Sequence, residues 1–339
     1  MNLDEKRVLV IRCGAIGDLV VSTSIIDSLR QKFGENVIID WVATPLGKKL
    51  FKHDKRLHHV FSLQHRKVPI SLSTAKRKII KHSKRNPYDL LINLDAGNVF
   101  KKLSKAIYAK ERFGRGFSDI DTEIKGDYAL NSNKRVYAPA IDDKKIVKEA
   151  MPMLYGEKKE LVWQRFSLPK EYIIINASNS HHKKSRINYR AWPKEQWKSL
   201  IAKLSKSVTL VIIGNRGEEK YFKEIAPFPS NVIDLVGKTS ISELITVVKN
   251  AKAIVTTDTG PAHIASALKT PIYVLIGPTP HKETGPYHSP ENPVTVISKH
   301  LSCAPCYKTE VMKACQDNIC MREITVEMVL KAMKKVLKQ

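Results

Sequence analysis

The sequence predicts an α/β protein made of two facing Rossmann-like halves, each a parallel sheet flanked by helices. Short runs rich in Val, Ile and Leu alternate with helical segments along most of the chain, as in βα repeats. The alternation pauses over residues 156–170, which we interpret as a linker, and the length of 339 residues suits two domains. We therefore expect domains at 1–160 and 170–322, and a last helix at 325–339 that packs back across their join.

The first half contains four expected strands, which are apolar and β-branched runs at 7–11, 37–43, 58–63 and 89–94. The loop after the first strand reads Gly14-x-x-Gly17-Asp18 and differs from the dinucleotide-binding fingerprint G-x-G-x-x-G. A helix should follow from Asp18 to about Lys32. Asp18 can stabilise the N-terminus of this helix, or it can serve as a general base at the mouth of the strand.

Later segments of the first half are less regular. A basic, Gly-rich stretch at 112–116 could line a site for an anionic acceptor, and a helix is expected at 144–155. Asp119-x-Asp121 falls in an expected loop, and we interpret it as a chance match to a metal-binding motif.

The second half continues the alternation, with strands expected at 172–175, 208–213, 232–236, 253–257 and 271–276. A polar loop at 176–180 is followed by the cations Lys183, Lys184, Arg186 and Arg190. Helices are expected at 194–204, near 218–226, and from a capping box at Ser240-x-x-Glu243 to Asn250.

The stretch from residue 253 to 287 is the most informative. Asp258-Thr259-Gly260 ends a buried strand, Pro261 suits the first turn of a helix, and Gly277-Pro278-Thr279 ends the next strand. Two strand ends and a helix N-terminus therefore converge, which favours a phosphate-bearing ligand held by Thr259, Gly260 and neighbouring N–H groups. The alternative is a βαβ connection that binds no ligand.

Composition indicates a soluble globular protein, with 42% hydrophobic and 27% charged residues. No apolar run approaches the ~20 residues of a membrane span, and the N-terminus lacks the features of a signal peptide, so we expect a cytoplasmic protein. The net charge of +25, densest at 76–85, favours a polyanionic partner such as an anionic membrane face. It is equally compatible with solvated Lys-rich helices. With 7% aromatic residues, specific nucleic-acid binding is not expected.

Four of the five cysteines form the pattern Cys303-x2-Cys306-x8-Cys315-x4-Cys320. Four thiolates could hold one structural zinc or iron ion, or they could be free thiols in an irregular tail. Two disulfides fit the spacing, but a reducing cytoplasm argues against them. Cys13 stands apart, and we expect it to be a small buried residue.

Several motifs occur in the order seen in the ADP-heptose:lipopolysaccharide heptosyltransferases, glycosyltransferase family 9. They are Gly17-Asp18, Arg190-Ala191-Trp192-Pro193, Asp258-Thr259-Gly260-Pro261-Ala262-His263 and Gly277-Pro278-Thr279, followed by the cysteine-rich tail. The resemblance covers nearly the whole chain, and the D-T-G-P-A-H element is its most specific part.

The resemblance implies a GT-B fold with a central cleft and an inverting sugar transfer. The donor would be ADP-L-glycero-β-D-manno-heptose, and the acceptor would be a Kdo- or heptose-bearing lipid A core. Asp18 matches the family's catalytic base. Catalysis of this kind needs no divalent metal. The enzyme would be peripheral on the cytoplasmic face of the inner membrane.

The resemblance also assigns the remaining site residues. Asp258, Thr259 and Gly260 match the diphosphate site, Arg190 stands where relatives carry a cation for the phosphates, and Ser178 is a candidate hydroxyl donor. Glu218 would hold the ribose and Thr239 would face the adenine. His263 would orient the phosphate loop or simply pack. On the acceptor side we place Arg12, Gly17 and Arg115.

Two alternatives remain open. The chain could use another nucleotide sugar or a protein acceptor, because the contacts that select a sugar cannot be identified in one sequence. It could also be a basic membrane- or RNA-binding protein without activity, although the presence of Asp18, Arg190 and the D-T-G element argues against this.

Overall fold

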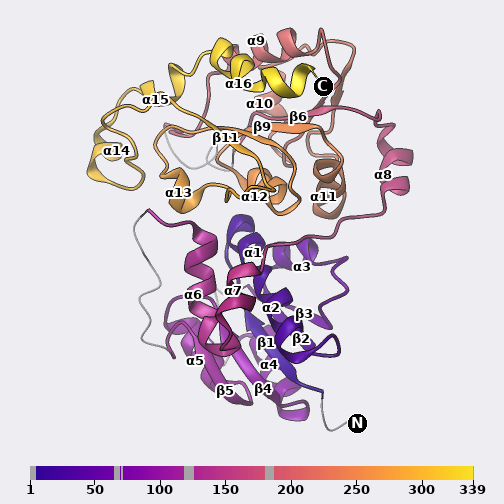
Figure 1. The fold of residues 1–339 in the computed structure, drawn as a ribbon, viewed down its shortest axis with the longest axis vertical. Coiled ribbons are helices and arrows are strands. Elements are labelled where there is room, and N and C mark those ends of the chain that lie inside the picture. The colour runs from indigo at the N-terminus through magenta and orange to yellow at the C-terminus, as the bar shows by residue number, and fades with distance from the viewer. Residues whose placement is uncertain (1–4, 65–68, 70–71, 118–125, 180–186, 339) are drawn as a thin grey trace. The chain divides into compact units, whose positions relative to one another are not determined.

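The computed structural model describes residues 5–64, 69, 72–117, 126–179 and 187–338. Its contacts divide the chain into two compact units, Met1–Tyr155 and Gly156–Gln339, each with its own parallel sheet (Figure 1). The predicted α/β class is therefore confirmed. The cations Lys183, Lys184 and Arg186 and the Asp119-x-Asp121 match lie outside the described residues.

The first unit contains a five-stranded sheet in the order β3-β2-β1-β4-β5, with every pair parallel. Its strands are β1 (Arg7–Ile11), β2 (Ile38–Ala43), β3 (His59–Ser62), β4 (Tyr88–Asn93) and β5 (Ala109–Gly114). The chain order reverses between β1 and β4. Loops that follow these two strands therefore diverge at one edge of the sheet, where ligands of open α/β sheets bind.

The helices of the first unit are α1 (Ile16–Ser22), α2 (Ser24–Phe33), α3 (Pro45–Leu50), α4 (Thr74–Arg85), α5 (Asn98–Ala106), α6 (Ala129–Ile141) and α7 (Lys144–Glu149). The single helix expected from Asp18 to Lys32 is wrong, because the chain breaks at Thr23. The hydroxyls of Ser22, Thr23 and Ser24 all donate to carbonyls three or four residues back, which competes with regular helical bonding.

Other expectations for the first unit need correction. The basic stretch at 112–116 is largely the edge strand β5, and the helix expected at 144–155 ends at Glu149. Pro152 explains the early end, because a proline disfavours helical backbone in the residue before it. Helix α6 carries an internal proline and was not anticipated.

The second unit contains a six-stranded sheet in the order β11-β10-β9-β6-β7-β8, again with every pair parallel. Its strands are β6 (Ile173–Asn176), β7 (Leu210–Ile212), β8 (Val232–Asp234), β9 (Ala253–Thr257), β10 (Ile272–Leu275) and β11 (Val294–Ile297). Five of them were expected from the sequence. β11 lies at the edge and is only partly buried, so its apolar signal is weak.

The helices of the second unit are α8 (Lys159–Phe166), α9 (Lys194–Leu204), α10 (Glu219–Lys223), α11 (Ile241–Lys249), α12 (Gly260–Ala267), α13 (His281–Thr284), α14 (Glu310–Ala314), α15 (Ile319–Arg322) and α16 (Val326–Lys338). The linker expected at 156–170 instead contains α8. The Glu157 N–H donates to the Ser242 carbonyl (3.0 Å), and Val162 is fully buried, so this segment belongs to the second unit.

The C-terminal helix α16 lies beside α9 (Figure 1). Its residues Val326, Val329 and Met333 are buried in the core of the second unit together with β10 and β11. A crossing of the join by this helix stays a prediction, as does the central cleft. In the part of the chain that the structure describes, every helix is too short or too polar to cross a membrane.

The end of β5 provides a test of the first sheet. Gly114 has φ +93°, and a Cβ there would lie 2.2 Å from the Asn93 carbonyl oxygen of β4. Gly97 has φ +99°, but a Cβ there meets nothing within 4 Å. We expect Gly97→Ala to cost about 1 kcal/mol of backbone strain. Gly114→Ala should cost a further ~1–3 kcal/mol because β5 must move away from β4. Urea denaturation of both variants measures the difference, and equal losses would contradict the close approach.

Candidate active site

Arg12 lies between two carboxylates at the carboxyl end of the first sheet. Its Nη2 donates to Oδ1 of Asp18 (2.9 Å), and its Nη1 donates to Oδ1 of Asp95 (3.2 Å) and to the Leu94 carbonyl (2.8 Å). Asp18 follows β1 and Asp95 follows β4, so the three side chains meet where the strand order reverses. This is the edge at which the sequence predicted a site.

Asp18 caps the first helix and is also reachable from solvent, while its role as a general base stays a prediction. Its Oδ2 accepts the Ala15 N–H (3.0 Å) in the first turn of α1, as a capping residue does. Its side chain is nevertheless 47% exposed, against 15% for Arg12 and 9% for Asp95. A Cβ at residue 14 would lie 2.5 Å from the Asp18 side chain, so Gly14 leaves room for it. Asp18 is therefore a fixed carboxylate that a ligand can reach.

Asp95 was not anticipated as a site residue. Its Oδ2 accepts the backbone N–H of Cys13 (2.5 Å), which ties the loop after β1 to the end of β4. Burial raises the pKa of Asp95, while Arg12 and the Cys13 N–H oppose that rise. The signal in the sequence is a polar residue directly after a buried strand. Cys13 is buried as expected, and burial together with Asp95 raises the pKa of its thiol.

The other acceptor-side residues lie at the same edge. Gly17 is in the first turn of α1. Arg115 follows β5, where its N–H donates to the Asn93 carbonyl (2.8 Å) and its own carbonyl accepts from the Asn93 amide (2.8 Å). The backbone of Arg115 is thus fixed against the end of β4. The role of both residues stays a prediction.

In the second unit, helix α12 begins at the carboxyl end of β9. The Thr259 hydroxyl contacts the Asn176 amide and the Thr256 hydroxyl (3.0 Å each), so this side chain points toward the sheet and makes no cap bond to α12. The N-terminus of α12 therefore lacks a side-chain cap, which suits an anionic ligand on the backbone amides. Thr259 would therefore contribute its backbone N–H rather than its hydroxyl, and Gly260 would contribute its backbone N–H.

Asp258 lies between two nitrogen-bearing side chains. Arg190 Nη1 is 3.3 Å from Oδ2 of Asp258 and 3.4 Å from its carbonyl oxygen, and His263 Nε2 is 3.9 Å from Oδ1. The Arg190 guanidinium also lies over the Tyr307 ring, 4.5 Å from its centroid. His263 is buried and lies beside Asp258, and its role in orienting the phosphate loop stays a prediction. The predicted phosphate-site residues are thus brought together.

Ser178 and Glu218 form a buried pair. The Ser178 hydroxyl donates to Oε2 of Glu218 (2.5 Å), which also accepts the Asn215 N–H (2.8 Å). The Ser178 hydroxyl therefore donates its hydrogen to Glu218 rather than to a ligand in this arrangement. Thr239 lies half-buried in the loop between β8 and α11. The structure joins two residues whose roles the sequence had treated separately.

The tail at 301–324 contacts two loops of the second unit, the loop after β10 and the loop that carries Arg190. The N–H groups of Cys306 and Tyr307 donate to the Pro278 carbonyl (2.9 Å each). The Tyr189 hydroxyl donates to the Cys315 carbonyl (3.2 Å), and the Asn318 amide donates to the Ala191 carbonyl (3.4 Å). The loop that carries Arg190 is therefore held by the cysteine-rich tail. Neither Tyr307 nor Asn318 was anticipated.

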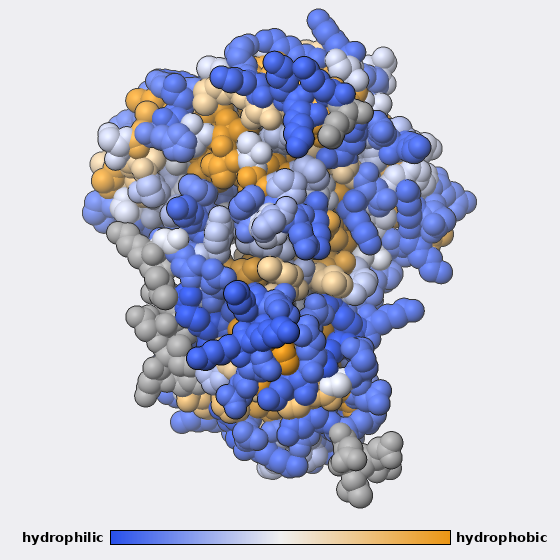
Figure 2. Space-filling model, in the orientation of Figure 1, coloured by the Kyte–Doolittle hydropathy of each residue, from blue (hydrophilic) through white to orange (hydrophobic). Residues whose placement is uncertain are grey.

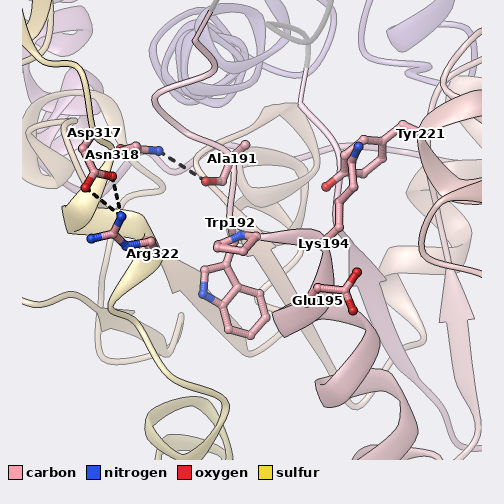
Figure 3. A pocket seen from close by; sticks show the side chains of 9 residues that line it. Ala191, Trp192, Lys194, Glu195, Tyr221, Asp317, Asn318 and Arg322 are labelled. Atoms are coloured by element: carbon pink, nitrogen blue, oxygen red, sulfur yellow. Dashed lines mark hydrogen bonds and ion pairs between the residues drawn. The ribbon is translucent and has the colours of Figure 1, made fainter.

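Figure 3 shows a pocket of ≈ 480 Å³ between this loop, the start of α9 and the tail. Asp317 and Arg322 pair on one side of it, and Lys194 and Tyr221 lie on the other. None of its nine lining residues is a predicted site residue. The Trp192 ring packs on Trp197 in the core, and the tail lines the pocket with Asp317, Asn318 and Arg322. We therefore attribute the pocket to the packing of the tail.

The four tail cysteines form no disulfide and differ in exposure, from exposed Cys303 to buried Cys306. Burial, followed by the other tail thiols, raises the pKa of Cys320 to about 11. Within the described ranges, no three Cys, His, Asp or Glu side chains are arranged to hold a metal ion. The metal site therefore stays a prediction.

Comparison with known proteins identifies the family. The model of glycosyltransferase family 9 (heptosyltransferase) matches residues 77–316, which is more than half of the chain. The chain belongs to glycosyltransferase family 9. The resemblance seen in the motifs is thereby confirmed, and the protein is a glycosyltransferase.

Individual relatives of this family-9 chain are distant in sequence. It is 22% identical over 300 residues to lipopolysaccharide heptosyltransferase 1 of Campylobacter coli, covering 81% of this chain and 84% of the relative. A family-9 glycosyltransferase from Veillonella parvula DSM 2008 has a TM-score of 0.81 at 16% identity, with 100% and 99% of the chains covered. The ADP-heptose lps heptosyltransferase II of E. coli has a TM-score of 0.73 at 20% identity, with 98% and 99% covered. These structural matches confirm the GT-B fold class.

Proposed function

We propose that this protein transfers L-glycero-D-manno-heptose from ADP-heptose to the Kdo- or heptose-bearing lipid A core of lipopolysaccharide, with inversion at the anomeric carbon. Family membership and the names of its relatives support the donor and the acceptor. The observation that carries the proposal is the reachable Asp18 carboxylate, fixed by Arg12 and Ala15 at the switch point of the first sheet.

Asp18 is the general base of the proposed reaction. The acceptor hydroxyl oxygen forms the new bond to the anomeric carbon while the bond from that carbon to the diphosphate oxygen of ADP breaks. The hydroxyl proton passes to the carboxylate of Asp18, and the electron pair leaves with ADP. A carboxylate exposed on one side and held on the other suits this role, because its position is fixed while the acceptor can still approach it.

The second unit binds the donor in this proposal. The backbone amides at Thr259, Gly260 and the start of α12 bind the diphosphate, and Arg190 stabilises the charge that develops on the leaving ADP. Asp258 and His263 orient Arg190 and the loop. The Ser178–Glu218 pair binds the ribose through Glu218, and Thr239 faces the adenine. The chemistry requires no metal.

We predict that Asp18→Asn lowers kcat at least ~100-fold, within the range for loss of a general base. Its affinity for ADP should be unchanged, because Asp18 lies in the other unit. Calorimetry with ADP and an assay of ADP release measure the two quantities. Asp143→Asn is the matched control, because Asp143 is an exposed acid that caps α7 away from the site.

Other outcomes of these measurements discriminate between functions. Full activity of Asp18→Asn would refute the base assignment. Binding of UDP and UDP-glucose in place of ADP and ADP-heptose would keep the fold and change the donor. Loss of activity in EDTA that Mg²⁺ alone restores would contradict metal-free catalysis. Failure of every nucleotide to bind would favour the basic membrane- or RNA-binding protein.

We further propose that one face of the first unit docks on anionic lipid, which places the enzyme peripherally on the cytoplasmic face of the inner membrane. Helices α4 and α5 cover the same side of the sheet, since Ile79 and Leu103 share a core cluster with Leu9 and Leu91. Neither helix contains Asp or Glu. Their exposed cations, which define the α4–α5 basic face, are Arg77, Lys78, Lys81, Lys84, Arg85, Lys101, Lys102 and Lys105.

Charge rather than apolar area carries this docking. Leu72 before α4 and Tyr108 after α5 are exposed at 70% and 48%, and Lys84 lies over the Tyr108 ring. Figure 2 shows a largely hydrophilic surface on the visible side of the first unit, with apolar side chains only in narrow strips. Each basic residue near an anionic surface contributes about 1 kcal/mol, so a face with eight of them can hold the protein reversibly.

Replacing Lys81, Lys84 and Arg85 with Gln should weaken binding to phosphatidylglycerol-containing vesicles at least tenfold, given about 1 kcal/mol per basic residue. Co-sedimentation measures the binding, and added salt should reduce it. The control replaces Lys331, Lys334 and Lys335 of α16, which are equally exposed and remove the same charge. Equal losses in both variants would show that net charge alone, and not this face, determines binding.

We also propose that the four tail thiols bind one structural zinc or iron ion. Their mutual effects on the pKa of Cys306 and Cys320 support proximity of the four. Because the described residues present no ready ligand set, the tail must rearrange around the metal. Free thiols are the alternative.

Alkylation by iodoacetamide tests the metal site. Cys303 should react first because it is exposed, and Cys13 only after unfolding, because its raised thiol pKa leaves little thiolate. Equimolar Zn(II) or Fe(II) should protect Cys303, Cys306, Cys315 and Cys320 together. Peptide mass spectrometry identifies the labelled residues. If neither ion protects more than one tail cysteine, the thiols are free.

A further inference from the structure

Asp95 is a buried carboxylate that the proposed reaction does not use. It binds Nη1 of Arg12 while Asp18 binds Nη2, so one guanidinium is shared between a 9% exposed and a 47% exposed carboxylate. Its backbone is pinned by Asn93, whose amide donates to the Asp95 carbonyl (3.0 Å) and accepts the Asp95 N–H (3.2 Å). The carboxylate therefore has little freedom to leave Arg12.

We propose that Asp95 is a positioning residue which, by sharing Arg12 with Asp18, fixes the Asp18 carboxylate and preserves its capacity to accept a proton. The inference rests on the proposed role of Asp18 as the base. Asp95 itself touches neither the donor nor the acceptor in this account, and it acts only through Arg12 and the loop after β1.

The electrostatic argument follows from the charges. A cation beside a carboxylate lowers its pKa by about 1–3 units and makes it a weaker base. If Arg12 were opposed by Asp18 alone, the base would be held in its charged form and would accept a proton poorly. Asp95 offsets the cation from the interior, where charges interact more strongly than at the surface. Asp18 thereby keeps the geometric benefit of Arg12 without its full electrostatic cost.

The elements packed against α1 carry charges of their own. Helices α3 and α6 pack against α1. From α6, Lys134 donates to the Lys148 carbonyl (2.7 Å) and Arg135 pairs with Asp127. From α3 come the exposed Lys48 and Lys49, of which Lys48 lowers the pKa of His59. In the loop itself, the Cys13 thiol has a raised pKa and is neutral. Asp18, Arg12 and Asp95 are joined directly by hydrogen bonds, and Arg115 is a further cation that follows β5 at the same edge of the sheet.

The direct test is titration of Asp18 by NMR of protein labelled with ¹³C at the aspartate carboxyls, with Asp18→Asn identifying the signal. In Asp95→Asn we expect the pKa of Asp18 to fall by about one unit, because the negative charge that offsets Arg12 is lost. Asp89→Asn is the matched control, because Asp89 lies on β4 and also binds a backbone N–H and a cation. It should leave Asp18 unchanged. An unchanged or raised Asp18 pKa in Asp95→Asn would overturn the proposal.

A second variant keeps the test decisive if Asp95→Asn does not fold. Arg12→Gln removes the shared cation, so the pKa of Asp18 should rise, and no rise would refute coupling through Arg12. Asp95→Glu retains the charge, so the pKa of Asp18 in this variant should match that in the unaltered protein. If the pKa of Asp18 falls as far in Asp95→Glu as in Asp95→Asn, the packing of Asp95 and not its charge acts on Asp18.

Kinetics separate this inference from the proposed function. In Asp95→Asn the acid limb of kcat should move about one pH unit lower and the plateau of kcat should fall severalfold, while KM for the donor stays constant. If Asp18→Asn keeps full activity, the base assignment fails, whereas the NMR titration still reports the coupling. If Asp18 is the base and the pH profile of Asp95→Asn does not move, the role of Asp95 fails alone.

Discussion

Parallel pairing of β1 with β4 is the constraint on which the first half of the site depends. Ile11 is in register with Asn93, so the residues that follow the two strands emerge side by side although they are some 80 positions apart in the chain. Arg12 then bridges the two loops with one side chain. Parallel strands have the same polarity, so their polar ends share one edge of the sheet and their apolar segments share the core.

In the second unit, too, a polar side chain at a strand end connects two parallel strands to a loop of the candidate site. Asn176 at the end of β6 is in register with Thr256 on β9, and its amide fixes the Thr256 and Thr259 hydroxyls. The start of α12 is thereby set by the sheet, and Arg190 reaches it from a loop that the tail supports. In both units an asparagine at a strand end, Asn93 or Asn176, connects the sheet to the loop that carries the candidate site residues.

Local patterns in the sequence predicted the elements that are buried on both faces, because their apolar runs are continuous and are ended by Gly, Asp or Pro. These patterns failed where an element begins or ends because of contacts with residues elsewhere in the structure. The break at Thr23 depends on three hydroxyls that bond back to the helix. The segment that leads into α8 is held by bonds from Glu157 to Ser242 and Thr246. Asp95, Tyr307 and the Ser178–Glu218 pair could not be assigned, because each acquires its partner only when distant segments fold together. The motif residues Asp18, Arg190 and Asp258 were identified because they follow expected strands or match a family pattern.

The hold of the tail on the Arg190 loop has a thermodynamic consequence. Trp192 donates its indole N–H to the Ile324 carbonyl (2.8 Å), which adds a further bond between loop and tail beyond Tyr307 and Asn318. Local unfolding of residues 301–324 therefore releases Arg190, and the loop cannot be ordered independently of the tail. Any anion that binds Arg190 in this position must also suppress the opening of the tail, by an amount set by its concentration relative to its dissociation constant. Backbone amides far from the ligand would thus exchange their hydrogens more slowly whenever the site is occupied.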